Sequence, residues 1–324
     1  MQPTTASANT ASRDPLVELS AARAVPLAPA ISRARATFEG AVADMLAVPD
    51  AALERPWLWR PDDPPGETDV RNALYRIVEV LEESVAAIAR GRAATRGEAT
   101  GPAVPRLATA TQARWSLHGA IWPLSVGHLD ADPGGGEWSV RRTLGHVVQS
   151  QRSYGWYSAW YLSRAGRPDA GSLPPDGALP PEPDEATEAP GDAAAIRRRL
   201  DGLLDAAAER FAALDDAGLA VPGRWSGLPV TIDFRLGRLG SHIREHTVQV
   251  DKTLAMIDRR PTEVERIVRL ACESFGRLEA AVFGRPESEL VSAFADGATA
   301  ASVVEGAAGE AARLARSARE TASA

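Results

Sequence analysis

Long amphipathic segments with a helical period dominate this chain of 324 residues and restrict its fold more than any other feature. In residues 69–90, Val70, Leu74 and Ile77 recur three or four positions apart, as on one face of a helix. Short alternating segments that would indicate strands are almost absent. The pattern predicts an all-α, bundle-like protein. The same period recurs in residues 30–46, 108–124, 139–166, 193–214, 232–257 and 262–283.

Segments without this period divide the chain. Residues 1–28 are small, polar and aperiodic, which predicts a disordered N-terminus before an N-terminal helix pair at 30–95. Residues 166–192 are acidic and rich in proline, which predicts an insertion that cannot pack regularly. A C-terminal helix is expected at 261–285, followed by an alanine-rich tail at 286–324.

Composition excludes several classes of function. A net charge of −7 argues against nucleic acid and anionic membranes as partners, since both select a concentrated basic surface. The single Cys272 excludes an internal disulfide and a multi-cysteine zinc site. No signal peptide and no apolar run of membrane-spanning length is evident, so a soluble cytoplasmic protein is expected.

One internal similarity suggests a duplication. Residues 69–78 (DVRNALYRIV) align with residues 139–148 (SVRRTLGHVV), and Arg76 then stands in the place of His146. A duplicated helix pair whose first copy lost a metal ligand would explain the match. Coincidence would explain it too, because any two buried helices share such a pattern.

Histidines provide the strongest indication of chemistry. His242 and His246 lie four residues apart in SHIREHTVQV, so both can reach one ion from a single helix face. The third ligand must come from another element, and His146 sits mid-helix among apolar residues. The alternative is a packed His146 and a solvated histidine pair. His118 could line a pocket or be packed, and His128 is expected to be exposed.

These motifs resemble the DinB-like superfamily, which includes mycothiol-dependent maleylpyruvate isomerases and bacillithiol transferases. The resemblance rests on EWSVRRTLGHVVQSQ and, 96 residues beyond His146, on HIREHTVQV, and it covers residues 107–258. It implies an up-down four-helix bundle that holds zinc or nickel through His146, His242 and His246. The N-terminal helix pair and the C-terminal helices would be additions to that bundle.

The resemblance also implies an activity. A metal-bound thiolate would attack a small electrophile, as in an S-transferase, or add to a double bond and leave it, as in an isomerase. The arginine-rich composition is typical of GC-rich, for example actinobacterial, genomes, for which mycothiol would be the thiol. Gln149 and Gln249 could orient thiol or water, or simply bond between helices. His118 and Arg142 could contact substrate.

Other functions stay open at this point. The motif H-x-x-E-H also occurs in the inverted-zincin proteases, in which Glu245 would be the general base. Those enzymes contain substantial sheets, whereas this sequence has almost no segments typical of strands. A hydrolase using metal-bound water, or a non-enzymatic bundle with a structural metal, would fit the same ligands. The expected partners are a small thiol and an electrophile, and a homodimer is conceivable for a bundle with spare apolar faces.

Overall fold

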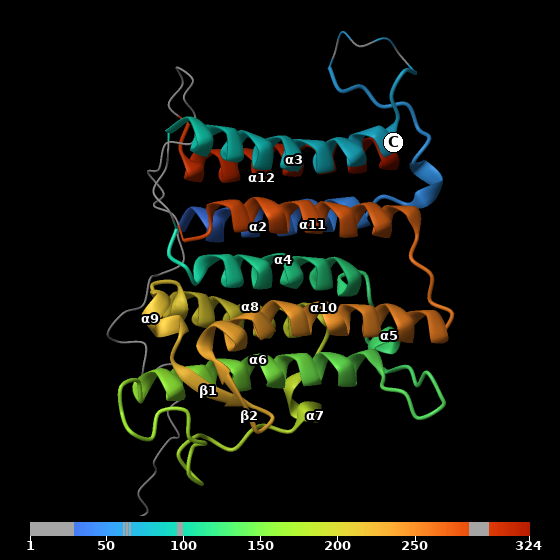
Figure 1. Ribbon diagram of the computed structural model, residues 1–324. Coiled ribbons are helices and arrows are strands. Elements are labelled where there is room, and N and C mark those ends of the chain that lie inside the picture. Colours follow the sequence, from blue (N-terminus) through green and yellow to red (C-terminus); the bar gives the residue numbers. More distant parts are fainter. Residues whose placement is uncertain (1–28, 61, 63, 65, 96–99, 285–297) are drawn as a thin grey trace, which may run out of the picture.

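The computed structural model describes residues 29–324 except 61, 63, 65, 96–99 and 285–297 (Figure 1). The disorder expected for 1–28 concerns a segment outside these residues. Helices make up most of the described chain, which confirms the all-α class. The long helices are α2 (Pro29–Leu46), α3 (Val70–Thr95), α4 (Val104–Ile121), α6 (Val140–Ser163), α8 (Ala193–Phe211), α10 (Ile232–Met256), α11 (Glu263–Val282) and α12 (Ala300–Ser323). The short elements are η1 (Asp50–Ala52), α5 (Val126–Asp130), α7 (Glu185–Glu188), α9 (Asp216–Leu219), β1 (Pro222–Trp225) and β2 (Leu228–Thr231).

Helices α4, α6, α8 and α10 pack around one apolar core and form the first bundle. Leu117, Val147 and Ile243 supply fully buried side chains from three of these helices. Strands β1 and β2 form an antiparallel hairpin whose connecting loop has two residues, Ser226 and Gly227. Ser226 and Gly227 both adopt positive φ there, as the mirror-image turns of tight hairpins require.

Helices α2, α3, α11 and α12 form a second bundle, which stacks on the first in Figure 1. Along the chain, the first bundle is inserted between α3 and α11. The region predicted as an alanine-rich tail contains α12, whose Ala308, Ala311, Ala315 and Ala318 are buried on one face. Methyl-sized side chains let α12 lie close to α2 and α3, so this part of the tail is a packed helix.

The two bundles meet where α4 and α11 pack side by side. A Cβ atom on Gly276 would lie 2.8 Å from Trp115 Cβ, and one on Gly119 would lie 2.8 Å from Arg269 Cα. Trp115 of α4 contacts Phe38 and Phe275 in the core of the second bundle, with ring centroids 5.6 and 4.7 Å away. Glycine at these two contacts thus allows α4 and α11 to lie close together, so that α4 contributes to both cores.

A buried ionic network also joins the bundles. Glu279 of α11 is fully buried and accepts hydrogen bonds from Arg114 Nη2 at 2.7 Å and from Trp115 Nε1 at 2.8 Å. Arg35 Nε donates to the same carboxylate at 3.0 Å, and Asp205 of α8 pairs with both arginines. Burial by itself raises the pKa of Glu279, but Arg35 and Arg114 outweigh it and hold that pKa below its usual range. The network therefore keeps Glu279 ionised in the core.

Asp201 lies at the edge of this network without a hydrogen bond to its Oδ1 among the described residues. Arg114 Nε is 3.4 Å and His118 Nε2 is 3.5 Å from that oxygen. Burial raises the pKa of Asp201 to about 6. Because the folded state keeps the proton that the unfolded chain releases near pH 4, ionisation of Asp201 lowers stability as the pH rises from 4 to 6.

We therefore expect Asp201→Asn to gain stability relative to wild type as the pH rises. The difference in unfolding free energy should be small at pH 4 and reach about 3 kcal/mol above pH 6, since the pKa is raised from 3.8 to about 6 and one pKa unit corresponds to about 1.4 kcal/mol. Urea unfolding of both proteins at several pH values measures it. A difference that does not change with pH would show that Asp201 has an ordinary pKa.

Candidate metal centre

Two helices of the first bundle bring three histidines together. Helix α6 begins at the N-cap Ser139 and carries His146, while α10 begins at the N-cap Thr231 and carries His242 and His246. One ring nitrogen from each histidine lies within 4.8 Å of the other two. Residues that are 96 positions apart in the sequence thus meet between two packed helices.

Hydrogen bonds on the far side of two rings fix which nitrogens face inward. Glu185 Oε1 lies 2.7 Å from His146 Nδ1, and Gln249 Oε1 lies 2.7 Å from His246 Nδ1. Both oxygens are acceptors, so each Nδ1 donates its proton and leaves the lone pair on Nε2. This is the arrangement by which proteins orient metal-binding imidazoles.

The spacing of the inner nitrogens fits a metal ion. His242 Nε2 and His246 Nε2 are 3.0 Å apart. Two nitrogens bound at 2.0–2.1 Å in a tetrahedral site would lie about 3.3 Å apart. Burial, followed by the charges of His246 and His146, lowers the pKa of His242 to about 3, and burial also lowers the pKa of His246. Neutral imidazole is the form that coordinates a metal, so the donor set is compatible with a divalent cation.

Glu185 reaches His146 because the end of the predicted insertion packs against α6. Glu182 accepts hydrogen bonds from Gln149 and Ser153, so the segment before α7 is held as well. A Cβ on Gly145 would lie 2.2 Å from the carbonyl oxygen of Glu185, so only glycine allows this approach. The expectation that 166–192 cannot pack regularly is therefore wrong for its last part.

Removal of the Glu185 carboxylate should weaken the centre. For Glu185→Ala we expect affinity for a divalent metal to fall about 10- to 100-fold, the usual effect of losing a group that orients a ligand. Competition with a chromophoric chelator measures the change. Glu182→Ala is the matched control, since it removes a neighbouring carboxylate that does not contact a histidine.

A second variant, Gly145→Ala, should also weaken metal binding, because it displaces Glu185 without removing its carboxylate. The added methyl group should push the Glu185 backbone away from α6 and weaken metal binding in the same direction. Equal affinities in wild type, Glu185→Ala and Gly145→Ala would show that the carboxylate does not orient His146.

Glu245 does not join the three histidines. Its carboxylate accepts two hydrogen bonds from Arg238, at 2.7 and 3.1 Å, and its side chain is 54% exposed. Arg238 also holds the pKa of Glu245 below its usual range. The carboxylate that a protease would use as a base is thus engaged in an ion pair at the surface.

His118 and His128 are not grouped with the three histidines of the centre. His118 is buried in α4 beside the Trp115 ring, and burial together with nearby arginines lowers its pKa. Its neighbours Trp115 and Asp201 lie at the interface between the bundles, and substrate contact by His118 stays a prediction. His128 is half-buried and caps α5 through Ser125, where exposure was expected.

Two aromatic side chains flank the centre. The Trp138 ring lies 5.4 Å from the His146 ring, and the Tyr154 ring lies 5.5 Å from the His242 ring. The exposed Arg142 guanidinium stacks 4.6 Å above the Trp138 ring, on the solvent side of the site. Trp138 belongs to the motif that starts α6, whereas Tyr154 could have been found as the residue two turns after His146 on the same helix face.

Comparison with known proteins agrees with this geometry. Residues 109–250 match the family model described as the DinB superfamily, and these residues contain all three histidines. No curated protein and no solved structure matches the chain. Among the described residues, no helix is long and apolar enough to cross a membrane. The match covers most of the first bundle, formed by α4, α6, α8 and α10, which is thus similar to the DinB superfamily.

Proposed function

We propose that the first bundle is a divalent-metal-dependent enzyme that uses a low-molecular-weight thiol. His146, His242 and His246 would hold zinc or nickel. When bound, the metal supplies Lewis acidity that lowers the pKa of a thiol or of water. The thiol would then act on a small electrophile, in an S-transfer or an isomerisation, with mycothiol as the first candidate thiol.

The orientation of the three imidazoles is the observation that carries this proposal. Glu185 and Gln249 turn the unprotonated nitrogens of His146 and His246 inward, and three neutral ligands leave a tetrahedral ion one open position. Gln249 therefore acts on His246 and not directly on thiol. Three protein ligands and an open position are typical of catalytic metal sites, whereas structural sites are closed by four.

The surroundings support a small substrate with an anionic group. Trp138 and Tyr154 would flank the reacting atoms and limit the access of water. Arg142, stacked on Trp138 and exposed, would attract a carboxylate or phosphate on the electrophile or on the thiol.

Turnover by metal-loaded protein in the presence of a small thiol tests the proposal. When zinc- or nickel-loaded wild type is mixed with mycothiol or another small thiol and an electrophile panel, mass spectrometry and chromatography should show one of two results. In an S-transfer the thiol is consumed as the adduct forms, and in an isomerisation the electrophile is converted to its isomer only when thiol is present, with the thiol regenerated. His146→Ala should lose this activity, while His128→Gln should retain it.

The two alternatives give different results in the same experiment. Turnover that needs metal but no added thiol would indicate a hydrolase that activates water. Loss of folding on chelation, without any thiol-dependent turnover, would indicate a structural metal in a non-enzymatic bundle.

A further inference from the structure

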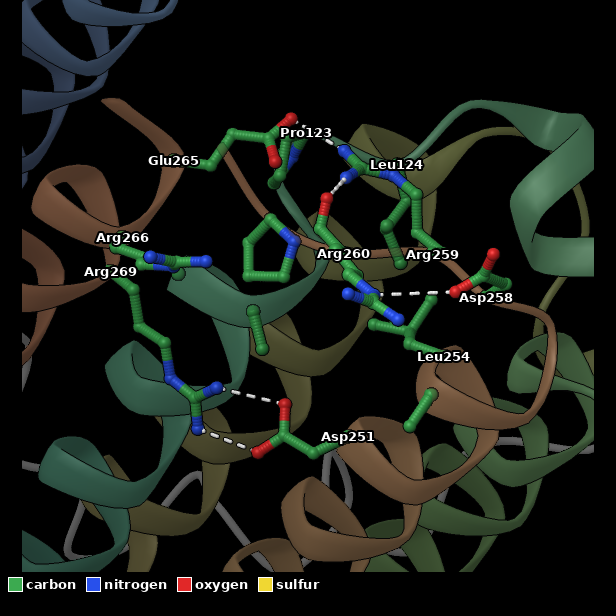
Figure 2. Close-up of a pocket in the computed structure, with 14 residues that line it drawn as sticks. Pro123, Leu124, Asp251, Leu254, Asp258, Arg259, Arg260, Glu265, Arg266 and Arg269 are labelled. Atoms are coloured by element: carbon green, nitrogen blue, oxygen red, sulfur yellow. Dashed lines mark hydrogen bonds and ion pairs between the residues drawn. The ribbon is translucent and has the colours of Figure 1, made fainter. Parts of the chain in front are cut away.

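A cavity lies between the two bundles, and none of the three histidines of the metal centre lines it. It has a volume of about 440 Å³, within the usual range for small-molecule sites (Figure 2). The C-terminal end of α4, the C-terminal end of α10 and the start of α11 enclose it. Leu124, Leu254, Pro123 and Ala120 provide apolar walls.

Arginine side chains line the rest of this cavity. Arg259, Arg260, Arg266 and Arg269 face three carboxylates there, so the lining carries one positive charge in excess. Two of the arginines are firmly paired. Arg269 donates to both oxygens of Asp251 at 2.8 and 3.0 Å, and Arg259 lies 2.5 Å from an oxygen of Glu265.

The other two arginines are available to a ligand. Arg260 meets Asp258 at 3.3 Å, with both side chains about 85% exposed, and such an exposed pair is worth at most about 1 kcal/mol. Arg266 forms no ion pair with a carboxylate in the described part of the chain. The charge of Arg266 helps to lower the pKa of Asp50, but the Asp50 carboxylate accepts its hydrogen bonds from backbone N–H groups of α11.

In Figure 2, Arg266 lies on one side of the cavity, and Arg260 lies on the other side near Leu254, where a dashed line joins it to Asp258. We propose that this cavity binds a small organic anion. Its carboxylate or phosphate group would lie between the guanidinium groups of Arg260 and Arg266, and its apolar part would rest on Leu124 and Leu254. Guanidinium groups present paired donors that match both kinds of anion.

The position of the cavity links this ligand to both bundles. Leu254 belongs to α10, the helix that carries His242 and His246, and Arg266 belongs to α11 of the second bundle. A bound anion would therefore hold these two helices together at their connection, residues 257–262. Binding here does not depend on the metal centre or on its reaction.

Calorimetric titration of the full chain with phenyl phosphate, benzoate and inorganic phosphate tests the proposal. Phenyl phosphate or benzoate should bind at low salt with a dissociation constant of about 1 mM or tighter. Inorganic phosphate should bind at least tenfold more weakly than phenyl phosphate, because it lacks an apolar part. Comparison of benzoate with phenyl phosphate distinguishes a carboxylate site from a phosphate site.

Variants locate the binding in the cavity. Arg260→Gln combined with Arg266→Gln should raise the dissociation constant at least tenfold, while Arg316→Gln, on an exposed face of α12, should leave it unchanged. Thermal unfolding of each variant checks that it is folded. Absence of binding by wild type, or equal binding by wild type and the double variant, would overturn the proposal.

Discussion

His242→Ala is expected to reduce bound metal from about one ion per chain to almost none, because three protein ligands are the minimum of a tight catalytic site. His242 is the most buried of the three histidines, and its Nε2 lies 3.0 Å from His246 Nε2. Without His242 only two imidazoles remain, and we expect dialysis against a weak chelator to remove a metal ion that two imidazoles hold. Elemental analysis by mass spectrometry after such dialysis measures the metal content.

Two controls make this result specific. His128→Gln alters a histidine that caps α5 and is not grouped with the other three, so its metal content should equal that of wild type. His146→Ala should behave like His242→Ala, although the two residues lie on different helices. Wild-type metal content in either alanine variant would contradict the assignment of that ligand.

Glu279→Ala is expected to lower the free energy of unfolding by about 3–5 kcal/mol. The change leaves Arg35 and Arg114 buried without the carboxylate that accepts hydrogen bonds from both. Trp115 Nε1 loses its acceptor as well. Urea unfolding followed by circular dichroism at neutral pH measures the loss.

An exposed ion pair provides the matched comparison. Arg106 pairs with Asp233 at 2.8 Å, with both side chains more than a third exposed, and Arg106→Ala should cost at most about 1 kcal/mol. The pKa of Glu279 is lowered in the folded protein, so its contribution is present above the ordinary glutamate pKa and is lost as the pH falls. Equal losses for Glu279→Ala and Arg106→Ala would show that the buried network does not stabilise the interface.

Sequence periodicity predicted much of this fold because each long helix buries one apolar stripe. The spacing of His242 and His246 places both on one face of α10, whatever the rest of the fold. The assignment of His146 as the third ligand needed more information, because the sequence of one helix does not show which other helix packs against it. There the order of the motifs and their resemblance to a known superfamily identified the partner.

Other features could not be found from periodicity. Residues 182–188 are held against α6 by the carboxylates of Glu182, Glu185 and Glu188. In a proline-rich sequence, only the regular spacing of these three glutamates could have indicated such contacts. Helix α12 buries alanine, whose small apolar surface makes an amphipathic pattern weak. Arg238 lies two turns before Glu245, a spacing that could have indicated their ion pair.

The structure shows where the two aligned segments of the possible duplication lie. Arg76, which aligns with His146, lies on α3 of the second bundle and pairs with Glu79 and Glu83 at 2.8 Å. The second bundle thus has an ion-pair cluster at this position. Common ancestry of the two helix pairs stays a prediction.

Anomalous scattering from crystals of zinc-loaded protein, recorded on both sides of the zinc absorption edge, tests the central assignment most directly. We predict one strong peak 2.0–2.1 Å from ring nitrogens of His146, His242 and His246, with Glu185 still bonded to His146 Nδ1. A peak bound elsewhere on the chain, or no peak between α6 and α10, would contradict the metal centre.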